Sequence, residues 1–236
     1  MKLKFGFSPC PNDTFIFDAI INGRIFQKGI EADPVLADIE TLNRMALNGI
    51  ADITKLSCST YPFVSDIYQL LNAGSALGRN CGPVLIQKGN HQWNDLSSLR
   101  IAIPGKLTTA NLLLTMFAPK AELKTEVVFS EIEDAVLKGK VDVGLIIHES
   151  RFTYQEKGLK KLADLGEIWE ATTGAPLPLG CIAIRRTLPE KVKAQVDKWI
   201  HDSVRFAFDN PQASRQFIQQ HASEMSESVQ KKQLLF

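Results

Sequence analysis

Several features that would place this chain of 236 residues in a large functional class are absent from its sequence. Basic and acidic residues balance, 27 against 26, so no excess positive charge is available for nucleic acid or an anionic membrane. No apolar stretch approaches the roughly 20 residues of a membrane-spanning helix. Asp13 and Asp18 interrupt the first hydrophobic region, so it does not resemble a signal peptide. These absences predict a cytoplasmic protein that binds neither nucleic acid nor membrane.

The cysteine and glycine patterns also lack the spacing that common cofactor and metal sites require. The four cysteines are scattered along the chain without metal-ligand spacing, at Cys10, Cys58, Cys81 and Cys181. No Gly-x-Gly-x-x-Gly turn follows an apolar strand, and the chain has no phosphate-binding loop. We therefore expect no cofactor and no metal, and a small molecule as substrate.

Short apolar runs alternate with helix-length amphipathic segments, which is typical of a parallel or mixed β-sheet flanked by helices. The expected strands cover residues 2–7, 30–36, 52–56, 67–73, 82–87, 99–103, 124–129, 142–147 and 180–185. The expected helices cover residues 13–22, 39–48, 60–64, 108–117, 131–138, 167–173, 189–208 and 211–221. The pattern predicts an α/β fold.

The chain is long enough to form two lobes of about 100 residues each. Residues 82–88 and 180–185 are the expected crossings between the lobes, because residues 99–147 between them contain their own series of strands and helices. We predict a discontinuous first α/β lobe of residues 1–87 and 185–236, and an inserted second α/β lobe of residues 88–184.

The segment that follows the first expected strand is a candidate ligand-binding turn. Ligands in open α/β sheets bind at the carboxyl ends of the strands, which makes Ser8 and Asn12 candidate substrate contacts. Prolines stiffen this turn, and Asn12 or Asp13 is expected to cap the helix that follows. Cys10 lies beside them, but no histidine is close in sequence, so we favour a structural role for its thiol.

The most informative stretch is residues 144–154, where an apolar run ends in His148 and charged neighbours. An unperturbed imidazole has a pKa of about 6.5, which suits proton transfer near neutrality. The alternative is a buried histidine that packs against apolar side chains. Glu149 and Arg151 are either a solvated charged pair or residues that orient the imidazole and fix a contact between the lobes.

Two further segments place polar groups at element ends. Thr108 and Thr109 stand where a turn enters a helix, and helix N-termini have unpaired N–H groups that favour anionic ligands. One threonine can cap the helix while the next faces a ligand. Lys55 ends an apolar strand, where it is either a surface residue or a partner for a substrate carboxylate or hydroxyl.

Taken together, these segments resemble the 1,4-dihydroxy-6-naphthoate synthases of the futalosine route to menaquinone, over residues 3 to about 227. The matching stretches are residues 3–14, 38–44, 54–57, 76–79, 104–110, 144–154 and 177–180. The resemblance implies a two-lobe type II periplasmic-binding-protein fold, with a double crossover and a cleft between the lobes. It also implies that His148 is the proton-abstracting base. Implied substrate contacts are Lys55, Leu56, Ser57, Thr109 and Ala110.

The reaction that the resemblance implies is that of a carbon–carbon lyase, which converts cyclic de-hypoxanthine futalosine into 1,4-dihydroxy-6-naphthoate. Two alternatives stay open. One is a chorismate dehydratase of the same pathway, to which the chain is less similar around residues 148–151. The other is a non-catalytic protein that binds a small carboxylate, which the lack of an export signal disfavours. The sequence leaves open whether the protein forms a homodimer.

Overall fold

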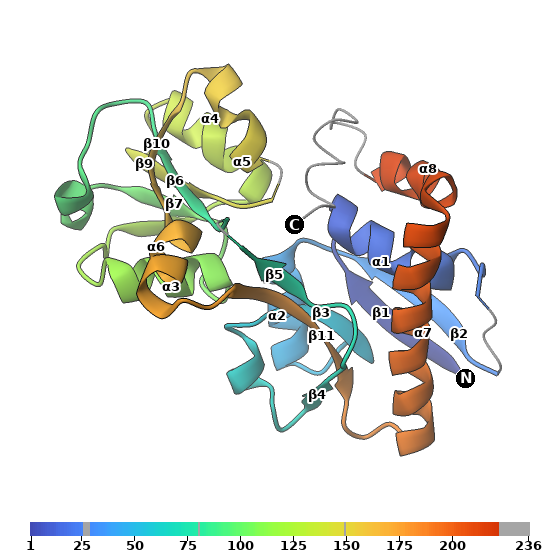
Figure 1. Ribbon diagram of the computed structural model, residues 1–236. Helices are drawn as coiled ribbons and strands as arrows, with labels where there is room; N and C mark the ends of the chain where they lie inside the picture. Colours follow the sequence, from blue (N-terminus) through green and yellow to red (C-terminus); the bar gives the residue numbers. More distant parts are fainter. Residues whose placement is uncertain (26–28, 80, 149, 222–236) are drawn as a thin grey trace. The chain divides into compact units, whose positions relative to one another are not determined.

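The computed structural model describes residues 1–25, 29–79, 81–148 and 150–221. The chain forms two compact units, which Figure 1 shows coloured along the sequence. Among the described residues, unit 1 consists of Met1–Ala76 and Gly180–His221, and unit 2 consists of Leu77–Leu179. The chain therefore passes twice from one unit to the other.

Unit 1 is built on a mixed sheet with the strand order β2-β1-β3-β11-β4, in which β5 also pairs with β11. Strand β1 is parallel to β2 and β3, whereas β11 is antiparallel to β3 and β4. The strands are β1 (Lys2–Phe7), β2 (Glu31–Leu36), β3 (Ile53–Ser57), β4 (Tyr68–Leu70), β5 (Ala76–Gly78) and β11 (Leu177–Arg185). The helices are α1 (Pro11–Ile21), α2 (Ile39–Leu47), the 3-10 helix η1 (Tyr61–Phe63), α7 (Glu190–Asp209) and α8 (Pro211–His221).

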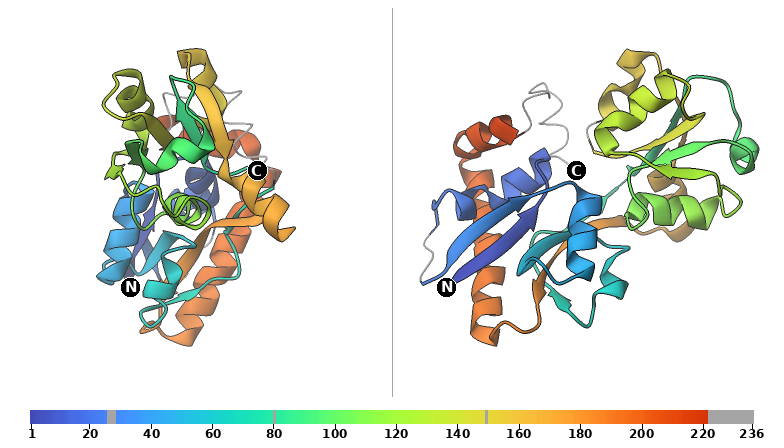
Figure 2. Two further views of the ribbon diagram at one scale, coloured as in Figure 1. Left: turned by 90° about the vertical axis from the view of Figure 1, so that its left-hand side faces the viewer. Right: turned by 180° about the vertical axis from the view of Figure 1, so that it is seen from behind.

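Helices cover both faces of the sheet in unit 1, α1 and α7 on one face and α2 on the other (Figures 1 and 2). Strand β1 alternates between exposed and buried residues at its start, and Phe5 and Phe7 both contact Phe17 of α1. The rings of Phe7 and Phe17 stack with centroids 4.6 Å apart. Trp199 of α7 joins the same apolar cluster. This packing fixes the start of α1 above the carboxyl end of β1.

Unit 2 contains a second mixed sheet with the order β10-β6-β9-β7-β8. Strand β7 is parallel to β8 and β9, whereas β6 is antiparallel to β9 and β10. The strands are β6 (Val84–Gln87), β7 (Ile101–Ile103), β8 (Lys124–Glu126), β9 (Val143–Ile146) and β10 (Lys160–Asp164). The helices are α3 (Thr109–Phe117), α4 (Ile132–Leu137), α5 (Ser150–Thr153) and α6 (Leu165–Thr173), with 3-10 helices η2 (Trp93–Ser97), η3 (Phe129–Glu131) and η4 (Tyr154–Lys157).

The central strands of unit 2 are buried on both faces, which explains their continuous apolar sequence. Alternate side chains of β6 and β9 enter two different apolar clusters. Leu85 and Leu145 pack with helices α3 and α6, whereas Ile86 and Ile146 pack with α4. Figure 1 shows these helices on opposite faces of the sheet. The sheet is therefore held rigidly between two layers of helices.

Most of the expected strands and helices are confirmed, with ends that differ by a few residues. The larger differences are strand β10, helix α5 and the short strand β5, none of which the apolar pattern indicated. The boundaries between the units, after Ala76 and after Leu179, also lie earlier in the chain than the expected boundaries after residues 87 and 184. Strand β6 pairs with β9 and β10 of unit 2, and most of β11 pairs with β3 and β4 of unit 1. Pairing partners, which a single strand's sequence does not reveal, decide where the units divide.

Candidate active site

The turn at the carboxyl end of β1 is organised by Asp13. Its Oδ2 accepts hydrogen bonds from the backbone N–H of Ser8 at 3.0 Å and from the Ser8 hydroxyl at 2.7 Å. The N-cap of α1 is Cys10, which makes no capping bond with its side chain, and Pro11 occupies the first helical position. The expectation that Asn12 or Asp13 caps this helix is therefore wrong. Both residues lie inside the first turn, and Asp13 reaches back to fix the turn instead.

Lys55 lies on the neighbouring strand β3 and is almost completely buried, with 5% of its surface exposed. Its Nζ lies 3.3 Å from Oδ1 of Asp13 and makes no hydrogen bond to any described residue. Burial lowers the pKa of the ammonium, but the Asp13 carboxylate outweighs this effect and holds the pKa above its ordinary value. Lys55 is therefore a buried, charged group with unused N–H donors, and not a surface residue.

Ser57 ends β3 and makes two hydrogen bonds with Asn43, which was not among the predicted site residues. The Ser57 backbone N–H donates to Oδ1 of Asn43, and Nδ2 of Asn43 donates to Oγ of Ser57, both at 2.9 Å. Asn43 is completely buried on α2. Between Lys55 and Ser57, the Leu56 side chain points into an apolar cluster with Ala46 and Tyr68. The Leu56 side chain is therefore not available to a ligand.

Three cysteines lie around Lys55, and the two that are buried, Cys10 and Cys181, have thiol pKa values above the ordinary range. Burial, reinforced by Asp13, raises the pKa of the Cys10 thiol to about 12, so this thiol is protonated near neutrality. The structural role that we favoured for Cys10 agrees with the 2.8 Å contact between its sulfur and the Ser8 hydroxyl. Cys58 and Cys181 share a hydrogen bond that lowers the pKa of Cys58 and raises that of Cys181.

In unit 2, Thr108 and Thr109 have different partners, and the helix-capping role predicted for one of them is confirmed. Thr108 is the N-cap of α3, and its hydroxyl oxygen accepts a hydrogen bond from the Asn111 N–H at 3.2 Å. The Thr109 hydroxyl donates to the Leu179 carbonyl at 2.9 Å. Ala110 is buried in the apolar cluster beneath the helix, so its contribution to a ligand would come from its backbone N–H.

His148 follows β9 and is half-buried, with its ring in edge contact with Phe129 at a centroid distance of 5.3 Å. Its backbone is in the left-handed region, with a φ of 57°, and it is the one non-glycine residue with positive φ in the described part of the chain. Such a conformation is costly for a residue with a Cβ and persists where surrounding structure imposes it. The ring is neither sealed in the core nor fully solvated.

Arg151 anchors the segment that follows His148. Its Nη1 donates to the Gly82 carbonyl at 2.7 Å, and its Nη2 donates to Oδ2 of Asp164 at 3.2 Å. Asp164 in turn caps α6 through the N–H groups of Gly166 and Glu167. These contacts all lie within unit 2. Glu149, the other charged neighbour of His148, lies outside the described residues.

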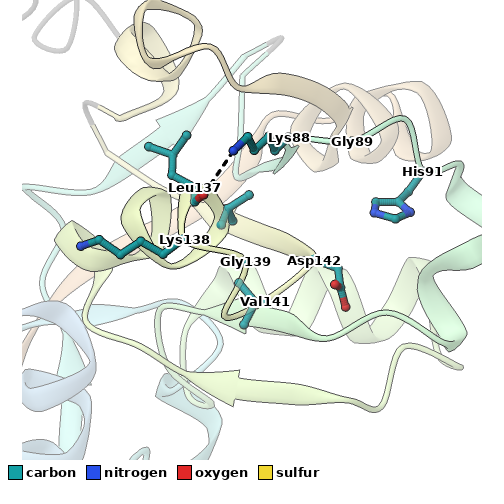
Figure 3. Close-up of a pocket in the computed structure, with 9 residues that line it drawn as sticks. Lys88, Gly89, His91, Leu137, Lys138, Gly139, Val141 and Asp142 are labelled. Atoms are coloured by element: carbon teal, nitrogen blue, oxygen red, sulfur yellow. Dashed lines mark hydrogen bonds between the residues drawn. The ribbon is translucent and has the colours of Figure 1, made fainter.

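The candidate residues of unit 2 lie at one edge of its sheet. Strands β7 and β9 run parallel, so the turn that leads from β7 into α3 and the segment that carries His148 leave the sheet at the same edge. A pocket of about 460 Å³ lies at the other edge, where β9 begins, and is lined in part by Lys88, His91 and Asp142 (Figure 3). None of the predicted site residues lines this pocket.

Two further features are absent from the described ranges. No group of three or more His, Cys, Asp or Glu side chains there is arranged to hold a metal ion. No helix in the same ranges combines the length and the apolar character that crossing a membrane requires.

Comparison with known structures defines the fold. A protein from Archaeoglobus fulgidus, solved by crystallography, superposes with a TM-score of 0.93 at 35% identity, over 99% of this chain and 87% of that one. The alkanesulfonate-binding protein SsuA from Xanthomonas axonopodis superposes with a TM-score of 0.75 at 15% identity, over 99% of this chain and 83% of that one. The chain therefore has the expected periplasmic-binding-protein-like α/β fold.

Comparison of sequences defines the family. A family model described as menaquinone biosynthesis matches residues 3–233. The 1,4-dihydroxy-6-naphthoate synthase of Thermus thermophilus is 46% identical over 227 residues, which cover 96% of this chain and 82% of that protein. The resemblance found in the sequence is thus confirmed, and the chain belongs to the menaquinone-biosynthesis family.

Proposed function

We propose that this chain is a cytoplasmic carbon–carbon lyase that converts cyclic de-hypoxanthine futalosine into 1,4-dihydroxy-6-naphthoate, with His148 as the base. The observation that carries the proposal is the placement of His148. It stands at the carboxyl edge of a rigid sheet, next to the amino end of α3, in a chain 46% identical to a synthase of this name. That edge is where α/β proteins carry out chemistry.

In the proposed reaction, the imidazole of His148 removes a proton from the bicyclic substrate. The electron pair left behind starts cleavage of a carbon–carbon bond, which releases the sugar-derived fragment, and the remaining ring becomes aromatic. Proton transfer by a positioned side chain contributes roughly 10²–10⁴-fold to a rate. Holding the substrate carbon close to the imidazole contributes further, because it removes the entropic cost of bringing the two together.

The remaining candidate residues bind the substrate in this proposal. Lys55 supplies positive charge and the Ser57 hydroxyl supplies a hydrogen bond, while Leu56 and Ala110 contribute backbone groups. Thr109 and the N–H groups at the start of α3 favour an anionic or oxygen-rich part of the substrate. Ser8 and Asn12 are weaker candidates, because the resemblance implies neither as a substrate contact and the Ser8 hydroxyl donates to Asp13.

A product assay with two substrates tests the proposal against its alternatives. Purified protein is incubated separately with cyclic de-hypoxanthine futalosine and with chorismate, and the products are identified by mass spectrometry. We expect 1,4-dihydroxy-6-naphthoate from the first and no change in the second. Dehydration of chorismate would favour the dehydratase alternative. Binding of either compound without a product on prolonged incubation would favour a non-catalytic binding protein.

A further inference from the structure

We propose that Asp13 is a positioning residue, which holds the ammonium of Lys55 charged and in place so that its other N–H groups bind an anionic oxygen of the substrate. This inference rests on the proposed function, in which Lys55 contacts the substrate. It concerns contacts within unit 1 only. None of the substrate contacts implied by the resemblance includes Asp13.

The first step of the argument is that Asp13 is itself immobilised. Its side chain is buried, with 2% of the residue exposed, although it occupies the first turn of a helix. Two donors from Ser8 hold Oδ2, which leaves Oδ1 directed at Nζ of Lys55, 3.3 Å away. The β1–α1 turn therefore delivers a negative charge at a fixed point beside the end of β3.

The second step is that Lys55 is not satisfied by this carboxylate. An ammonium has three N–H donors, and Nζ makes no hydrogen bond within the described residues although it is buried. Gly180 of β11 is what leaves room for the Lys55 side chain, because a Cβ at that position would lie 3.0 Å from Cε and 3.7 Å from Nζ. Buried donors without acceptors are costly, and a ligand oxygen would satisfy them.

The third step concerns charge. Burial lowers the pKa of Lys55, and the attraction of Asp13 raises it. The other titratable groups around Lys55 are thiols, Cys10 at the start of α1, Cys58 after β3 and Cys181 on β11. The pKa values of Cys10 and Cys181 are raised, so these thiols are neutral near pH 7. Asp13 is thus the main group that keeps the ammonium charged.

The experiment replaces Asp13 with Asn, which can keep the contacts to Ser8 but removes the charge. We expect KM to rise by roughly tenfold or more, because losing a hydrogen bond between the substrate and a charged group weakens binding by about that factor. The alkaline limb of kcat/KM should also move to lower pH, because a buried lysine without its partner loses its proton more readily. The profile is repeated in a Cys58→Ser background, so that ionisation of Cys58 is not mistaken for that of Lys55.

Asp18→Asn is the matched control. Asp18 is also a buried carboxylate of α1, and it pairs with Arg24 at 3.2 Å and accepts a hydrogen bond from Ser214 at 2.7 Å. Its loss should lower the melting temperature while KM and the pH profile stay as in the wild type. If Asp13→Asn behaves like this control, with only its stability changed, the proposal is overturned.

Two further variants separate the possible failures. Asp13→Glu keeps the charge but moves it, so KM should rise while the alkaline limb stays in place, and this test stands if Asp13→Asn does not fold.

In a Lys55→Met background, Asp13→Asn should cause no additional rise in KM, and independent, multiplying effects would refute action through Lys55. An unchanged KM in Lys55→Met alone would refute the proposed contact of Lys55, and with it this inference. Wild-type protein without any turnover would instead refute the proposed function.

Discussion

At the scale of single residues, the conformation of His148 is the feature that most needs explaining. A left-handed backbone costs a residue with a Cβ roughly 1–2 kcal/mol. The chain accepts this cost where both sides of the residue are fixed, by the buried strand β9 before it and by the Arg151 contacts after it. In this conformation the imidazole ring contacts the ring of Phe129 edge-on. A fixed imidazole is what a general base requires.

Two substitutions at position 148 test this interpretation of the backbone. His148→Ala and His148→Gly both remove the imidazole, but only glycine adopts positive φ without strain. We expect His148→Gly to be the more stable variant, by about 1 kcal/mol, as measured by thermal or denaturant unfolding. Ala194→Gly, at an exposed position of α7, is the control and should show the usual opposite order. A more stable His148→Ala would mean that the left-handed conformation is not imposed on this residue.

Sequence reasoning proposed individual candidate residues but not the residues that hold them in place. His148, Lys55 and Ser57 stand at the ends of apolar strands, a pattern that is visible along the chain. The roles of Asp13 and Asn43 depend on which elements pack together, because each binds a residue of another element. The capping prediction for Asn12 or Asp13 was wrong for a local reason. Pro11 at the first helical position moves the N-cap back to Cys10.

At the scale of elements, close contact between β9 and α4 fixes the strand that leads to His148. Gly144 of β9 faces α4, and a Cβ there would lie 2.6 Å from Cγ2 of Ile132 and 2.9 Å from Cγ2 of Val136. Both distances are shorter than side-chain carbons tolerate. The absence of a side chain at position 144 therefore allows the helix to approach the strand.

Gly144→Ala should force α4 and β9 apart and destabilise unit 2 by about 1–3 kcal/mol, the usual cost of overpacking. It should also lower kcat, because the strand that ends before His148 shifts. Both effects are measurable, by unfolding and by turnover. Gly89→Ala is the control, since its added methyl group would meet only the ring of His91, at 3.2 Å. Equal stability of Gly144→Ala and the wild type would show that this contact does not constrain the strand.

Elements with an apolar pattern were predictable, whereas those with a polar sequence were not. The buried strands β6, β7 and β9 are short apolar runs, and α7 shows helical spacing of its buried residues. Strand β10 contains two exposed lysines and lies at the edge of its sheet, where apolar residues are not required. Such a strand forms because a partner strand is present.

At the scale of the whole molecule, the balanced charge and the double passage of the chain were both visible in the sequence. The exact division into units was not, because it depends on which sheet β6 and β11 join. Each unit carries its own set of candidate residues at one sheet edge. Unit 1 presents Lys55 and Ser57, whereas unit 2 presents Thr109 and His148.

The most direct test of this account is the turnover of His148→Ala with cyclic de-hypoxanthine futalosine, measured beside its affinity for 1,4-dihydroxy-6-naphthoate. We predict that kcat falls by roughly 10²–10⁴-fold, the contribution of a positioned base, while the product binds within a few-fold of the wild-type affinity. Unchanged binding would show that the variant is folded and that its site is intact. A kcat close to that of the wild type would contradict the assignment of His148 as the base.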